Sequence, residues 1–189
     1  MTKNRLEAFS DGVIAIIITI MVLELKVPHE ATWEALRELT PVFLSYLLSF
    51  TYVAIYWNNH HHMLHATHKV NGAVLWANMG LLFALSIVPF ATAWMGENHF
   101  APIPVAAYGI ALLLPAITYY ILSQALVRLH GPESTLAKAI GSDVKGRISL
   151  AIYIAAAIIA HWLPAVAMAC YVLVAIMWLV PDPRIERAR

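Results

Sequence analysis

Six long apolar segments, separated by short polar stretches, constrain the fold more than any other feature. They cover roughly residues 6–26, 41–59, 73–95, 103–127, 147–162 and 164–180. A helix needs about 20 apolar residues to cross about 30 Å of hydrocarbon, and these segments are long enough or nearly so. The chain is 61% hydrophobic and 12% charged, whereas a soluble domain usually carries about 25% charge. We therefore predict an all-α integral membrane protein, with six transmembrane helices in one domain spanning residues 1–189.

Basic residues in the polar stretches predict how these helices are oriented. If both termini lie on one side of the membrane, the other side carries only Lys26 and Arg37. The side with the termini then carries the remaining basic residues: Lys3, Arg5, Lys69, Arg128, Lys138, Lys145, Arg147, Arg184, Arg187 and Arg189. Lysine and arginine are enriched in cytoplasmic loops. We expect a multi-pass protein of the cell membrane with both termini in the cytoplasm.

The first apolar segment begins with a polar cluster that contains Arg5, Ser10 and Asp11. Asp11 lies at or inside the predicted membrane boundary. A carboxylate costs roughly 2.5–3.5 kcal/mol at the bilayer centre on insertion scales, and less near the edge. We expect Asp11 to have a partner on a neighbouring helix, and the cluster to fix how the helices pack.

Further along this segment, apolar residues recur on one helical face. They are Val13, Ile16, Ile20 and Leu23. This face either contacts lipid and neighbouring helices, or lines a narrow pore in which rings of branched side chains gate by dewetting. In the second case Thr19 flanks the constriction and Glu24 attracts cations at the outer mouth. Alternatively, Glu24 is an interfacial carboxylate near Lys26.

A histidine cluster follows Trp57 at the end of the second segment. Its members are His60, His61, His62, His65 and His68. The spacing of His61, His65 and His68 permits zinc or copper binding on a helix. However, no cysteine or acidic run completes a site, so we expect no bound metal. The alternative is that His60 and His61 join the inner polar cluster, while the other three face solvent.

Two features of the third segment indicate interhelical packing. Asn78 is a lone amide among apolar residues, which is typical of a hydrogen-bond partner between helices. Pro89 predicts a kink near the outer end, with the hydroxyl of Thr92 bonding backbone groups that the proline frees.

The sequence also argues against several classes of function. It contains no arrangement of nucleophile, base and orienting residue, and no glycine loop for phosphate, so we expect neither an enzyme nor a cofactor. A net charge of +1 without a basic stripe gives no sign of nucleic-acid binding. A secondary transporter usually has a polar site at the membrane midplane, whereas the polar residues here cluster at the inner end. A scaffolding protein that carries no ion flux is a further alternative.

The Arg5-x-x-x-Phe9-Ser10-Asp11 motif resembles the signature of the transmembrane protein 175 family of potassium channels. Three further stretches of the first half fit this family: Trp57-x-x-His60-His61, Asn78 and Pro89-Phe90-x-Thr92. The second half of the chain matches the family only in hydropathy and length.

The resemblance implies a homotetramer that conducts potassium passively through a pore lined by the first helix. By position, the constriction falls on Ile16, Ile20 and Leu23, and Thr19 contributes to potassium preference. The inner ends of the helices would be held by a network comprising Arg5, Phe9, Ser10, Asp11, Trp57, His60, His61 and Asn78. No cofactor is implied, and no role is implied for His62, His65 or His68. The alternative function is a proton-coupled transporter or a proton-conducting channel.

Overall fold

The computed structural model describes residues 2–141 and 143–179. Val180 and the basic residues Arg184, Arg187 and Arg189, which contributed to the predicted topology, lie outside this part of the chain. The described residues form nine helices and no strand: α1 (Lys3–Leu23), α2 (Trp33–Glu38), α3 (Thr40–His65), α4 (Gly72–Ser86), α5 (Val88–Glu97), α6 (Pro102–His130), α7 (Thr135–Ile140), α8 (Val144–Ile159) and α9 (Pro164–Leu179).

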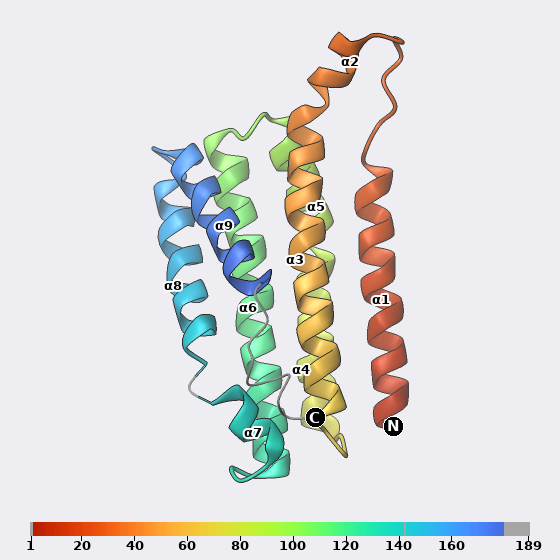
Figure 1. Cartoon of the computed structure of the whole chain (residues 1–189), viewed down its shortest axis with the longest axis vertical. Coiled ribbons are helices and arrows are strands. Elements are labelled where there is room, and N and C mark those ends of the chain that lie inside the picture. Colours follow the sequence, from red (N-terminus) through yellow and green to blue (C-terminus); the bar gives the residue numbers. More distant parts are fainter. Residues whose placement is uncertain (1, 142, 180–189) are drawn as a thin grey trace.

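The long helices run side by side as a bundle, with α1 at one edge and α8 and α9 at the opposite edge (Figure 1). Four helical stretches are long and apolar enough to cross a membrane: residues 3–23, 40–65, 72–97 and 102–130. The third of these comprises α4 and α5. The helices α8 and α9 contain 16 residues each. The prediction of an all-α fold is therefore confirmed for the described residues, and four of the six predicted membrane-spanning segments correspond to helical stretches long enough to cross a bilayer.

The helix boundaries follow local sequence signals. Helix α3 begins at Thr40 with Pro41 in its first turn, where a proline loses no helical hydrogen bond. It continues to His65, beyond the predicted end near residue 59, so most of the histidine cluster is helical. The predicted kink is a break at Ile87 between α4 and α5, because Pro89 has no N–H to continue the helix. The Thr92 hydroxyl bonds the Val88 carbonyl at 2.7 Å. The carbonyl that Pro89 leaves without a helical donor is that of Leu85, four residues earlier, so the predicted bond from Thr92 to a freed backbone group is not the one observed.

Two apolar cores hold the bundle together. One lies where α1, α3, α4 and α6 meet, and the other lies among α3, α5, α6, α8 and α9. Helix α1 packs against α3, α4 and α5. It does so through one face, whose buried members are Leu6, Ser10, Ile14, Ile17 and Met21. The other side of α1 is uncovered by the rest of the described chain.

Candidate functional site at the start of α1

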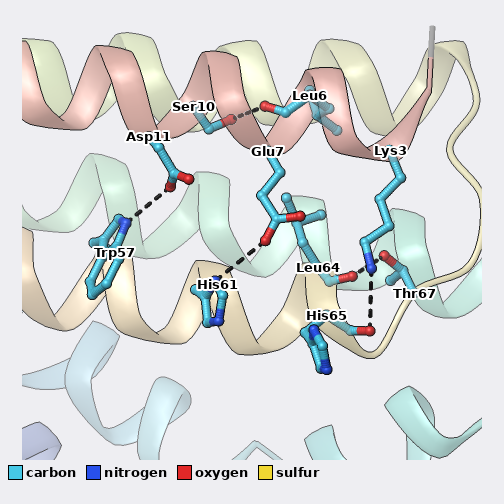
Figure 2. Close-up of polar contacts among 10 residues, drawn as sticks. All are labelled: Lys3, Leu6, Glu7, Ser10, Asp11, Trp57, His61, Leu64, His65 and Thr67. Atoms are coloured by element: carbon cyan, nitrogen blue, oxygen red, sulfur yellow. Dashed lines mark hydrogen bonds and ion pairs between the residues drawn. The ribbon is translucent and has the colours of Figure 1, made fainter.

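Three polar contacts link the first half of α1 to the second half of α3 (Figure 2). The Trp57 indole N–H donates to the Asp11 carboxylate at 2.9 Å. One turn away, His61 Nδ1 lies 3.3 Å from Glu7 Oε1. One turn further, Lys3 Nζ donates to the His65 carbonyl at 3.4 Å. Residues four apart share a helical face, so the contacts follow one seam between two antiparallel helices. We call these six residues the α1–α3 ladder.

The ladder supplies partners to charged and polar groups on both helices. Asp11 receives the indole donor, and a hydrogen bond to an ionised acceptor is stronger than one between neutral groups. The carbonyl of His65 belongs to the last turn of α3, where carbonyls lack helical partners. Lys3 caps it with an ammonium, which is the favoured charge at a helix C-terminus.

A second polar group is buried behind the ladder and joins α1, α3 and α4. Asn78 Nδ2 donates to Ser10 Oγ at 3.0 Å, and His60 Nε2 lies 2.8 Å from Asn78 Oδ1. The Asn78 oxygen accepts, so His60 carries its proton on Nε2. His60 Nδ1 is buried and has no hydrogen-bond partner among the residues that the structure describes. Ser10, His60 and Asn78 are all buried, and we call them the buried triad.

The structure thus brings together six of the eight residues predicted for the inner polar network. The other two, Arg5 and Phe9, are exposed on the subunit, and within the described chain Arg5 makes no hydrogen bond or ion pair. Sequence reasoning missed Lys3 and Glu7. Their spacing of four residues from each other, and of Glu7 from Asp11, is the signal that places all three on one face of α1.

The remaining histidines do not form a metal site. The His61 ring stacks with His65 and contacts His62 edge-on, and His62 is half-buried instead of facing solvent. The His68 amide donates to His130 Nε2 at 3.2 Å. Across residues 2–141 and 143–179, no group of three or more potential ligands could hold a metal ion.

The residues predicted for a pore constriction lie on the exposed side of α1. Ile16, Ile20 and Leu23 are 59%, 44% and 74% exposed. Ile16 and Ile20 line an open groove of about 600 Å³ between α1 and α5, in which Phe90 forms part of the far wall. Thr19 is exposed, and its hydroxyl bonds the Ala15 carbonyl within the helix at 2.9 Å.

Two acidic residues lie at the end of the bundle where α1 finishes. Glu24 is exposed and also lines the groove. Lys26 pairs with Glu97 at the end of α5 at 2.8 Å, and this pairing raises the pKa of the Lys26 ammonium. Lys26, the basic residue nearest to Glu24 in the sequence, is therefore paired with Glu97 and not with Glu24.

Comparisons with known proteins identify relatives of this chain. The family described as "Endosomal/lysosomal potassium channel TMEM175" matches residues 5–89. A potassium channel from Chryseobacterium sp. (strain P1-3) is 54% identical over 188 residues, covering 100% of this chain and 98% of the relative. The human endosomal/lysosomal proton channel TMEM175 is 35% identical over 99 residues, covering 46% of this chain and 19% of the human protein.

A solved structure extends the similarity to the whole fold. The crystal structure of a lysosomal potassium-selective channel TMEM175 homolog from Chamaesiphon minutus matches with a TM-score of 0.81 and 29% identity. The match covers 94% of this chain and 96% of that one.

The fold and the site define an integral membrane protein of helical-bundle type, whose first helix is fixed by polar contacts at one end and leaves an apolar face open. The relatives named above are channels and not enzymes. This chain belongs to the TMEM175 family.

Proposed function

We propose that the chain is one subunit of a potassium-selective channel in the cell membrane. Four copies surround a pore lined by α1, and ions move passively down their gradient. Relatives named as potassium channels support this proposal. The membrane is crossed by α1, α3, the α4–α5 segment, α6, α8 and α9, which leaves both termini in the cytoplasm. At 1.5 Å per residue, α8 and α9 are each about 24 Å long, so the bilayer thins around them.

The exposed apolar face of α1 carries this proposal. Ile16, Ile20 and Leu23 are uncovered in the subunit, although α1 is tied firmly to α3 and α4 on its other side. Closed cyclic symmetry would bring each residue into a ring with its symmetry mates. Rings of isoleucine and leucine form a constriction that hydrated ions pass only when it widens.

Other residues on and near α1 have supporting roles in this proposal. Thr19 lies beside the isoleucine rings and contributes a hydroxyl to ion preference. Glu24 sits at the outer mouth, where its charge raises the local concentration of monovalent cations. The polar residues at the inner end, with Arg5 and Phe9 among them, hold the helix ends together within and between subunits. None of these inner residues is an ion ligand.

An ion-flux assay on purified protein in liposomes tests the function directly. We expect potassium flux to exceed sodium flux, and to rise linearly with the gradient. Flux that saturates and depends on an opposing proton gradient would instead indicate a proton-coupled transporter. No flux of any ion under these conditions would contradict the channel and leave a scaffolding role.

A proton-conducting channel is the second candidate function. It is favoured by the vertebrate relatives, which are named endosomal/lysosomal proton channels. The same liposomes, loaded with a pH-sensitive dye, distinguish the two. With potassium efflux supplied by valinomycin, acidification of the lumen without a protonophore identifies proton conduction. Acidification that needs an added protonophore but no valinomycin identifies a potassium channel.

A further inference from the structure

A second site lies on the side of the bundle away from α1, between α3, α6, α8 and the end of α9 (Figure 1). The pocket has a volume of about 50 Å³, several times the roughly 10–15 Å³ that one water needs. Its wall is dominated by six aromatic side chains: Tyr52, Tyr56, Tyr119, Tyr120, Tyr153 and Trp178. A largely apolar pocket with a few polar groups is the usual form of a small-molecule site.

The polar groups of this pocket favour a positively charged ligand. Asp143 supplies a carboxylate to the wall, and it is half-buried. Of the described residues that line the pocket, none is a lysine, an arginine or a histidine. Burial raises the pKa of the Asp143 carboxyl, because the charged form loses contact with water. The Gly146 N–H and the charge of Arg147 oppose this rise but do not cancel it. A bound cation would offset that loss.

The backbone holds this carboxylate in place. Asp143 has a left-handed conformation, with φ of 43°, and it caps α8 by accepting the Gly146 N–H at 3.1 Å. A Cβ atom at Gly146 would collide with the carboxylate, so glycine is what allows this close approach. The carboxylate is therefore a fixed part of the wall and not a freely rotating surface group.

Two neutral polar groups in the wall retain their hydrogen-bonding capacity. Among the residues the structure describes, neither the Tyr56 hydroxyl nor the Asn59 side-chain amide makes a hydrogen bond. Tyr119 donates only to the Asn59 main-chain carbonyl. An ammonium has three N–H donors and no acceptor. The oxygens of the Tyr56 hydroxyl, the Asn59 amide and the Asp143 carboxylate could accept one hydrogen bond each. The Trp178 ring already has an ammonium near it, since Lys145 Nζ lies 5.9 Å from the ring centroid.

We propose that this pocket binds an organic ammonium, with the nitrogen against Asp143 and a small apolar body against the tyrosine rings. Aromatic faces attract cations through their quadrupole, and an apolar body gains from leaving water. The same chemistry occurs in a soluble amine and in the ethanolamine headgroup of a membrane lipid. Binding here is independent of whether ions move along α1.

Binding of 2-phenylethylammonium to the purified protein tests the proposal, with 2-phenylethanol as the neutral probe of the same shape. Titration calorimetry should detect the ammonium and give much weaker or no heat with the alcohol. The Asp143→Asn variant should bind the ammonium about tenfold more weakly, because the charge-assisted contact is lost. Asparagine retains the capping oxygen and tolerates the left-handed backbone, so the melting temperature should not change.

Two further variants separate the pocket from general charge effects. Glu133→Gln removes an exposed carboxylate from the loop before α7, where it pairs with Lys138 of that helix. This variant should bind the ammonium with the affinity of the wild type. Tyr120→Ala removes one half-exposed ring of the wall and should weaken binding about two- to fivefold, as expected for one cation–π contact. Equal affinity of wild type and Asp143→Asn, equal affinity for the alcohol, or no ammonium binding at all would overturn the proposal.

A competition experiment identifies the source of the ammonium. The protein is placed in nanodiscs of phosphatidylglycerol, with and without phosphatidylethanolamine, and titrated with 2-phenylethylammonium. If the ethanolamine lipid reduces the affinity of wild type but not that of Asp143→Asn, the lipid headgroup occupies the pocket. If it has no effect on either, the pocket serves a soluble amine.

Discussion

The indole nitrogen of Trp57 and the carboxylate of Asp11, 2.9 Å apart, fix the register of α1 against α3. The contacts of Glu7 with His61 and of Lys3 with the His65 carbonyl repeat the same pairing one and two turns away. A slip of α1 by one residue along α3 would therefore break all three contacts together. This end of α1 is anchored, whereas the apolar residues beyond Gly12 are held on one face only.

Replacing Asp11 by alanine should weaken assembly more than ion preference. The substitution leaves the Trp57 N–H without its charged acceptor, and a hydrogen bond to a charged group contributes about 1.5–3 kcal/mol. We expect a lower melting temperature and less oligomer in native mass spectrometry, with the potassium-to-sodium ratio of the remaining channels unchanged. Intact oligomers with an altered ratio would contradict this role.

The matched control for Asp11 is Lys26→Ala at the other end of α1. Lys26 and Glu97 form an exposed ion pair, and such pairs contribute about 0–1 kcal/mol. Melting temperature and oligomer content should stay close to those of the wild type.

Replacing Asn78 by leucine should destabilise the subunit by about 1–3 kcal/mol, because Ser10 and His60 then lose a buried hydrogen-bond partner. Chemical unfolding in detergent micelles measures the change. Gln124→Leu is the control, since this half-buried amide on α6 makes no hydrogen bond in the described part of the chain. Equal effects of the two substitutions would mean that the buried triad adds nothing to stability.

Replacing Ile16 or Leu23 by asparagine should raise ion leak severalfold, because a polar ring allows water to fill the constriction. Single-channel recording in planar bilayers measures the conductance. Ile110→Asn is the control, because Ile110 is similarly exposed, at 53%, but lies on α6. If all three variants conduct like the wild type, α1 does not line the pore.

Gly96→Ala should destabilise the packing of α3 against α5. A Cβ atom at Gly96 would lie 2.8 Å from Val42 Cα, a backbone atom that moves only with its helix. Overpacking of this kind typically costs about 1–3 kcal/mol. Gly80→Ala is the control, since its Cβ would meet only Thr118 Cγ2 at 3.8 Å. The melting temperature should fall for Gly96→Ala and stay constant for Gly80→Ala.

Much of the fold could be predicted because membrane helices are encoded locally. Hydropathy identified the long helices, and Pro89 identified the break between α4 and α5. The lone amide of Asn78 and the carboxylate of Asp11 were both expected to bond other helices, and both do. A polar group in an apolar segment requires a partner, even when the sequence does not name it.

The parts that could not be predicted depend on which residues meet in space. Lys3 and Glu7 meet partners only because α3 extends to His65, beyond the predicted end near residue 59, which brings His61 and the His65 carbonyl opposite them. Arg5 has the same charge as Lys3 but lies on another face of α1, away from α3. The aromatic pocket draws its wall from four helices and a loop, so no single stretch of sequence contains its pattern.

The interruption at Ile87 divides one crossing of the bundle into two helical rods. The first rod, α4, carries Asn78 and packs along α6. The second, α5, carries Phe90 beside the open face of α1. The groove beside α1 is therefore bordered by the second rod, whereas the amide contacts with Ser10 and His60 belong to the first. A single proline thus assigns anchoring and bordering of α1 to separate halves of the same segment.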